Sequence, residues 1–164
     1  MTNESKLDRG RDRPKTTVSR HMNAAPSRVF EVMTDAWLFP VWVVGATHIR
    51  NVDETWPARG SKVHHQVGAW PLMISDSTEV IECEAPHKLA LQGRAYPLGE
   101  ARIELTVEPD GPDGAVVTMA EAPSYGPALL FDNPLMRWVL AARNRETLNR
   151  LAAIAENRHE TSRP

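Results

Sequence analysis

Hydrophobic and polar residues alternate along most of the chain, and helical spacing takes over only near its C-terminal end. The alternation is cleanest in residues 101–108, where the odd positions are apolar and the even positions are polar. Such a strand has one face in water and one face covered. This pattern predicts seven strands: Thr16–Asn23, His48–Glu54, Ser61–Val67, Leu72–Glu84, Leu89–Ala95, Ala101–Glu108 and Ala115–Glu121.

Three stretches follow helical spacing instead. Two are short and come after the first strand, at 25–33 and at 36–42, and Pro26 suits the first turn of the former. The third, Pro134–Asn157, would make roughly six turns. Its second half has one apolar stripe, whereas residues 135–142 are apolar nearly all round. We therefore expect that first half to be covered on all sides, by the sheet and by residues 123–132.

The junctions between the predicted strands are short and rich in Gly, Pro and Asp, which favours an antiparallel meander. At 164 residues the chain fits one domain with its own apolar core. We expect that domain at 15–157. Residues 1–14 and 158–164 carry many charges and little to bury, which is typical of flexible tails.

Composition narrows the classes of function. A net charge of −2 with interspersed acids and bases argues against a nucleic-acid-binding face. No stretch approaches the roughly 20 apolar residues that span a bilayer, and residues 1–15 lack the apolar core of a signal peptide. Cys83 is the single cysteine and cannot form an internal disulfide. We expect a cytoplasmic protein that is not an integral membrane protein.

Four segments, taken in order, resemble a known family. They are APSRVF at 25–30, WLFPVWVVG at 37–45, EVIECEAPHKLAL at 79–91 and RNRETLNRL at 143–151. Together they make the chain similar to START-like polyketide cyclases, dehydrases and lipid-transfer proteins (the SRPBCC superfamily) over residues 16–157. The resemblance implies an α+β helix-grip fold: a curved antiparallel sheet of about seven strands wrapped around a long C-terminal helix. That superfamily includes both carriers and enzymes, so the fold does not fix the function.

The helix-grip fold tends to enclose a pocket, and parity assigns the residues that would line it. In each strand the apolar residues of the alternating pattern should face the helix. For strands 72–84 and 115–121 the pattern does not decide which residues face inward. Aromatic side chains would add flat apolar surface with a polar tip. The candidate ligand-binding residues are Trp42, Val63, His65, Val67, Trp70, Leu89, Leu91, Tyr96, Ile103, Leu105, Met119, Leu135, Trp138, Val139 and Ala142.

Two titratable residues are candidates for acid–base chemistry. His65 shares parity with Val63 and Val67, so it should point inward, where a neutral imidazole can move a proton or orient a ligand. A structural histidine bonded to a neighbouring strand is the commoner case. Glu121 shares a face with Met119, and an inward carboxylate needs a partner. Asn144 falls on the buried stripe of the last helix, where a bond to a strand carbonyl is the simpler expectation.

No motif indicates a metal or an organic cofactor. His64 and His65 are adjacent, so they point to opposite faces of a regular strand and cannot chelate one metal. There is no CxxC pair, no nucleophile elbow and no phosphate-binding glycine loop. The sequence does not fix the oligomeric state and leaves a homodimer open.

Two functions fit these patterns. The first is binding of a hydrophobic or aromatic small molecule, a lipid or a polyketide-like compound, between the sheet and the last helix. The alternative is a polyketide cyclase or dehydratase in which His65, or a carboxylate such as Glu121, serves as acid or base. A protein-interaction role without a ligand is a third, weaker interpretation.

Overall fold

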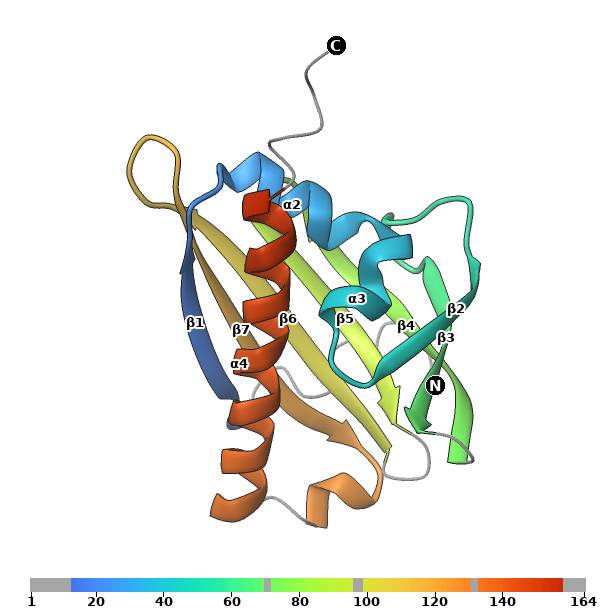
Figure 1. Ribbon diagram of the computed structural model, residues 1–164. Helices are drawn as coiled ribbons and strands as arrows, with labels where there is room; N and C mark the ends of the chain where they lie inside the picture. Colours follow the sequence, from blue (N-terminus) through green and yellow to red (C-terminus); the bar gives the residue numbers. More distant parts are fainter. Residues whose placement is uncertain (1–12, 70–71, 96–98, 131–132, 158–164) are drawn as a thin grey trace.

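The computed structural model describes residues 13–69, 72–95, 99–130 and 133–157. Within them, seven antiparallel strands form one curved sheet that is crossed on its inner side by a long helix (Figure 1). The elements are β1 (Thr16–Met22), α2 (Pro26–Thr34), η1 (Ala36–Leu38), α3 (Phe39–Trp42), β2 (Ala46–Val52), β3 (Lys62–Ala69), β4 (Leu72–Glu84), β5 (Lys88–Ala95), β6 (Gly99–Pro109), β7 (Ala115–Tyr125), η2 (Pro127–Leu130) and α4 (Pro134–Asn157). The predicted helix-grip fold is confirmed.

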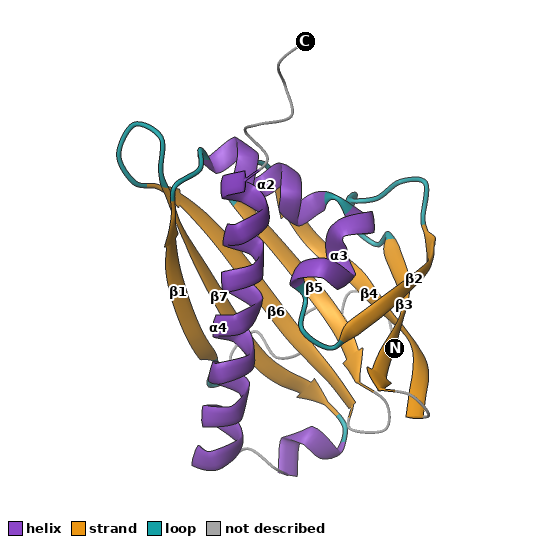
Figure 2. Cartoon of the chain, viewed as in Figure 1, coloured by secondary structure: helices purple, strands orange, loops and turns teal. Residues whose placement is uncertain are grey.

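The strand order explains how the sheet encloses the helix. Strands β2 to β7 follow one another as a meander, whereas β1 crosses to pair with β7, with Val18 opposite Met119. The connection from β1 to β2 therefore carries α2 and α3 across the sheet. Helix α4 packs against β1, α2 and α3, so one side of the sheet is covered by helices (Figure 2).

The second half of α4 is fixed to the sheet by a stripe of buried side chains. Asn144, Thr147, Leu148, Leu151, Ala152 and Ala155 are all nearly inaccessible to solvent, and their spacing of three and four residues keeps them on one face. The two alanines allow the helix backbone to approach the sheet closely. This half matches the sequence-based prediction.

The first half of α4 does not match it. Leu135 is 68 % exposed and Trp138 is 65 % exposed, and Val139 and Ala142 are exposed as well. These four residues follow i, i+3, i+4, i+7 spacing on the face opposite the buried stripe. The first turns of α4 run beyond the end of β1 (Figure 2), so the sheet does not reach round to their outer face. The prediction that this half is covered on all sides is wrong.

The two faces of α4 should respond differently to truncation. We expect Leu151→Ala to lower the free energy of unfolding by about 2–5 kcal/mol, because it opens a cavity in the core. Trp138→Ser should change it by no more than about 0.5 kcal/mol, because its ring is largely in water. Urea unfolding followed by circular dichroism measures both. Comparable losses in the two variants would show that the first half of α4 is covered in solution.

Candidate functional site

The inner face of the sheet is built from alternate residues of β3 to β7. Among the predicted inner residues, Val63, Leu89, Leu91, Leu105 and Met119 are 0–2 % exposed and belong to the apolar core, together with Trp42. Ile103 is partly buried against the same core, and Val67 is half-buried near the end of β3. The predicted inward parity of β3, β5 and β6 is confirmed for these residues. Their contact with a ligand stays a prediction.

His65 is a buried polar residue on this apolar face. It is 3 % exposed, and its Nε2 lies 2.9 Å from the Oγ1 of Thr78 on the neighbouring strand. The Phe39 ring of α3 lies against the imidazole, with ring centroids 5.5 Å apart. The other ring nitrogen, Nδ1, is buried and has no hydrogen-bond partner among the described residues. The predicted inward orientation is therefore confirmed.

Asp76 lies beside His65 and was not predicted from the sequence. The two residues are directly opposite in the register of β3 and β4, so their side chains share the inner face. Asp76 is 6 % exposed; its Oδ1 accepts a hydrogen bond of 2.6 Å from the Ser77 backbone N–H. Its Oδ2 is buried without a hydrogen-bond partner in the described part of the chain.

The alternation of β4 does not identify Asp76 as an inward-facing residue, because polar and apolar residues occur on both faces of this strand. The register with β3 would have found it. Val63 is inward by its own alternation and pairs with Thr78, and this places Thr78 and Asp76 on the inner face.

A pocket opens next to Asp76 because β4 separates from β5. Pairs between these strands begin at Thr78 and Gly93, whereas β4 pairs with β3 from Leu72 onward. The pocket has a volume of about 570 Å³ and is lined by residues of β2 to β7 and the turn after β7. Its polar lining includes Arg50, His64, Asp76, Arg94, Glu100 and Tyr125.

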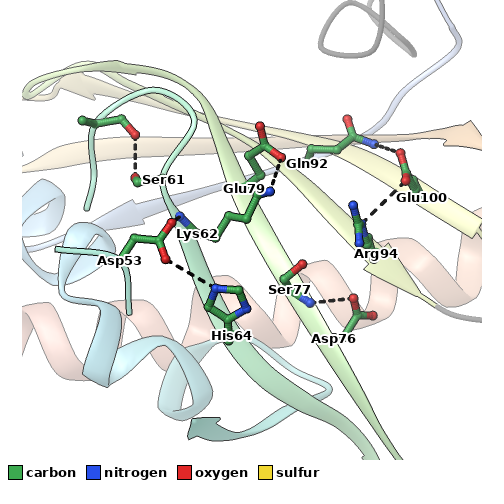
Figure 3. Close-up of polar contacts among 11 residues, drawn as sticks. Asp53, Ser61, Lys62, His64, Asp76, Ser77, Glu79, Gln92, Arg94 and Glu100 are labelled. Carbon is green, nitrogen blue, oxygen red and sulfur yellow. Dashed lines mark hydrogen bonds and ion pairs between the residues drawn. The ribbon is translucent and has the colours of Figure 1, made fainter. Parts of the chain in front are cut away.

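Some of the polar side chains around this opening form ion pairs (Figure 3). Arg94 Nε lies 3.7 Å from Glu100 Oε1, and His64 Nε2 lies 3.4 Å from Asp53 Oδ1. His64 is half-buried, on the face opposite His65, as predicted. The pocket thus lies at the splayed end of the sheet and not beneath the second half of α4, where side chains fill the core.

The surroundings of His65 favour its neutral form. Burial lowers the pKa of His65, and the Asp76 carboxylate opposes that effect only in part. A neutral imidazole has one donor and one acceptor nitrogen. Nε2 takes one of these roles toward Thr78, and the Gln66 backbone beside the ring offsets a further part of the effect of burial on the pKa of His65.

Glu121, the second candidate for acid–base chemistry, is in an ion pair. It is 5 % exposed, and Arg143 of α4 donates from Nη2 to its Oε2 at 2.8 Å. Arg143 Nε also donates to Asn144 Oδ1 at 3.2 Å. Asn144 is fully buried as predicted, and its Nδ2 has no partner among the described residues. The pair neutralises a carboxylate that would otherwise be buried alone, and it ties β7 to α4.

The other predicted ligand-binding residues are not gathered around His65. Trp70 and Tyr96 lie outside the described residues. Leu135, Trp138, Val139 and Ala142 are on the exposed face of α4, so a role in ligand binding stays a prediction for them. Trp42 packs edge-on against Phe39, with its Nε1 buried and unpartnered within the described ranges.

In the described residues, no three His, Cys, Asp or Glu side chains are grouped as a metal site would require. The helices described there also include none long and apolar enough to cross a membrane.

A family assignment follows from comparison with known proteins. Residues 13–156 match the family model described as polyketide cyclase / dehydrase and lipid transport. The chain belongs to this family. No curated protein matches it.

Solved structures share the fold at low sequence identity. A protein of unknown function from Staphylococcus aureus, SA2116, has a TM-score of 0.68 at 8 % identity, over 92 % of this chain and 99 % of that one. A protein from Rhodobacter sphaeroides has a TM-score of 0.65 at 22 % identity, over 84 % and 89 %. The di-domain ARO/CYC BexL from the BE-7585A biosynthetic pathway has a TM-score of 0.61 at 14 % identity, over 92 % of this chain and 51 % of its own length. At these identities the likeness shows the fold alone.

Stability should fall at acid pH because of His65. The unfolded state takes up a proton below about pH 6.5, while burial keeps the folded His65 neutral to lower pH. The free energy of unfolding should therefore drop as pH falls from 6.5, by at most about 1.4 kcal/mol per pH unit from this group. In His65→Gln that part of the slope should disappear, and in the control His64→Gln it should remain. Equal slopes in wild type and His65→Gln between pH 7 and pH 5 would contradict the prediction.

Removing Arg143 and removing Glu121 should lower the free energy of unfolding by different amounts. Arg143→Leu leaves a 6 % exposed carboxylate without its partner, and we expect a loss of about 3–5 kcal/mol. Glu121→Gln leaves an arginine side chain that is 35 % exposed and can turn to water, so the loss should be smaller, about 1–2 kcal/mol. Denaturant unfolding of both variants measures this asymmetry. The reverse order would show that Glu121 is not buried in solution.

Proposed function

We propose that this protein binds a hydrophobic small molecule, a lipid or a polyketide-like compound, on the inner face of its sheet. The molecule enters through the opening between β4 and β5. The observation that carries the proposal is the buried polar group of His65, Thr78 and Asp76, of which Asp76 lines a pocket of about 570 Å³. Two atoms of this group, His65 Nδ1 and Asp76 Oδ2, lack partners among the described residues, and a buried polar atom normally has one.

The apolar residues around the polar group support the same function. Small-molecule sites are mostly apolar with a few placed polar groups that set orientation. Here Leu91 and Val63 belong to the apolar core next to the polar group, Ile103 packs against that core, and Ile74 lines the pocket itself. Gly93 and Ala101 pair with each other on the inner face beside Thr78, and the tip of Ile103 lies over Gly93. Membership of a family that includes lipid transport is consistent with such a cavity.

The alternative is a cyclase or dehydratase, as in the other part of the family description. It is favoured by one observation, the buried imidazole of His65, whose pKa is lowered by burial. A group of this kind can take a proton from a bound substrate or give one up. Glu121 is less suited to that role because Arg143 already occupies its carboxylate.

Native mass spectrometry of the protein purified from its own host tests the binding function. We expect a bound species of a few hundred daltons, because a pocket of this size takes a molecule in that range. Gly93→Leu projects a side chain onto the inner face, where its first added atom would lie 3.2 Å from the flexible tip of Ile103 and 3.9 Å from the Ala101 carbonyl oxygen. This variant should lose the bound species.

The control is Ala153→Leu, which also introduces a leucine, on the exposed face of α4. It should keep the bound species at the wild-type level. Native protein without any bound mass, or equal occupancy in Gly93→Leu and wild type, would refute binding on the inner face.

A further inference from the structure

The outer face of the sheet has a buried centre, although α2, α3 and α4 all lie on the inner side (Figure 2). Arg102 lies on the outer face because its neighbour Ile103 faces the core, and yet Arg102 is only 2 % exposed. Gln92, directly opposite it on β5, is 6 % exposed. An arginine on an open sheet face would have most of its side chain in water. Another part of the chain therefore covers the centre of this face.

The buried area is confined to the middle of β5, β6 and β7. Ala90 on β5 and Ala122 on β7 share the face of Arg102 and are 0 % and 1 % exposed. Toward the ends of the strands the same face is open, since Glu84 and Glu108 are exposed. The cover is thus local and leaves the ends of the strands in water.

We propose that residues 1–12 dock on this outer surface and cover Arg102. The described chain begins at Arg13, and the ammonium group of Lys15 already pairs with Glu104 on the outer face of β6. A twelve-residue segment spans up to about 40 Å when extended, whereas the three strand spacings from β7 to β4 amount to about 15 Å. The inference goes beyond the proposed function, because it holds with or without a bound small molecule.

The other segments outside the described residues are too short or follow elements on the inner side. Residues 96–98 join the paired ends of β5 and β6, and residues 70–71 join those of β3 and β4. Connections of two or three residues cannot reach Ala90, which lies near the opposite end of β5. Residues 131–132 precede α4 and residues 158–164 follow it, on the inner side of the sheet. The N-terminal segment is left as the cover.

The covered surface requires a hydrogen-bond donor. Gln92 Nε2 donates to Ser124 Oγ at 2.5 Å, but Gln92 Oε1 is buried and has no partner among the described residues. A buried amide oxygen of this kind normally accepts from an N–H or O–H group. An extended segment offers a backbone N–H at nearly every residue, and residues 1–12 add basic side chains. This segment can therefore satisfy the acceptor while it excludes water from Arg102.

Paramagnetic broadening in NMR spectra locates the segment directly. A nitroxide is attached at Ser5→Cys in a Cys83→Ser background, and backbone amide signals are compared before and after reduction of the nitroxide. We expect the signals of Ala90, Gln92 and Arg102 to lose most of their intensity, because a docked segment holds the nitroxide over them. Signals from the second half of α4, on the other side of the sheet, should keep theirs.

A variant of equal length separates docking from tethering alone. Residues 6–12 are replaced by alternating glycine and serine, which keeps the nitroxide at the same distance along the chain and removes the native side chains. Broadening at Ala90 and Gln92 should then fall to the level seen in α4. A flexible tail, which the composition of this segment predicts, would give the same weak pattern in both proteins. That result would overturn the inference, as would equal broadening of α4 and β5 in the first protein.

Deletion of the segment gives a second, label-free measurement. The Nε–H of Arg102 donates to Glu104 at 2.9 Å, and in the chain that begins at Arg13 it should exchange with water several-fold faster. The control is the Nε–H of Arg143, which donates to Asn144 on the inner side and should exchange at the same rate in both chains. An unchanged rate at Arg102 would show that residues 1–12 do not cover it. Should the shortened chain not fold, the broadening comparison decides.

Discussion

The packing of α4 against the curved sheet is the contact on which the rest of this structure depends. A seven-stranded sheet with one apolar face must cover that face, and the buried stripe from Asn144 to Ala155 does so for β1 and the strands beside it. One helix is too narrow to cover a sheet of this width. The far side, toward β3 and β4, is left to the short helix α3 and its side chains Phe39 and Trp42.

This incomplete cover explains where the polar groups lie. Close to α4 the interior is packed, and Glu121 is tolerated there because Arg143 pairs with it. Toward the splayed end of β4 the cover consists of Phe39 and an opening, and His65 and Asp76 each keep one buried polar atom that no described residue satisfies. Partly satisfied polar groups cost stability, so their place beside a pocket points to a use other than folding.

The sequence predicted those features that depend on local periodicity. The alternation in β6 is clean and gave its inner face correctly, and His65 followed from its parity with Val63. Strand β4 offered no clean alternation, and Asp76 emerged only once the register with β3 was known. The ion-pair partner of Glu121 could not be predicted from the sequence either, because Arg143 is distant in sequence and contacts Glu121 only in the folded state.

The first half of α4 shows where a prediction from local hydrophobicity fails. Its apolar residues at 135, 138, 139 and 142 predicted burial, yet they form a stripe on the side away from the core. A helix with apolar residues on all sides has apolar surface on every face. The length of the sheet decides which part of that surface is covered. The coverage of this helix is thus a property of the whole fold and not of the segment.

The central claim is that a ligand meets the inner face of the sheet at the opening beside β4. The most direct measurement is an isotope-filtered NMR experiment on methyl-labelled protein with 2-naphthol as an aromatic probe. The account predicts nuclear Overhauser effects from the naphthol ring to methyl groups of Ile74 and Ile103, which lie at the pocket and on the inner face. Effects confined to Leu135 and Val139, on the exposed side of α4, would contradict it.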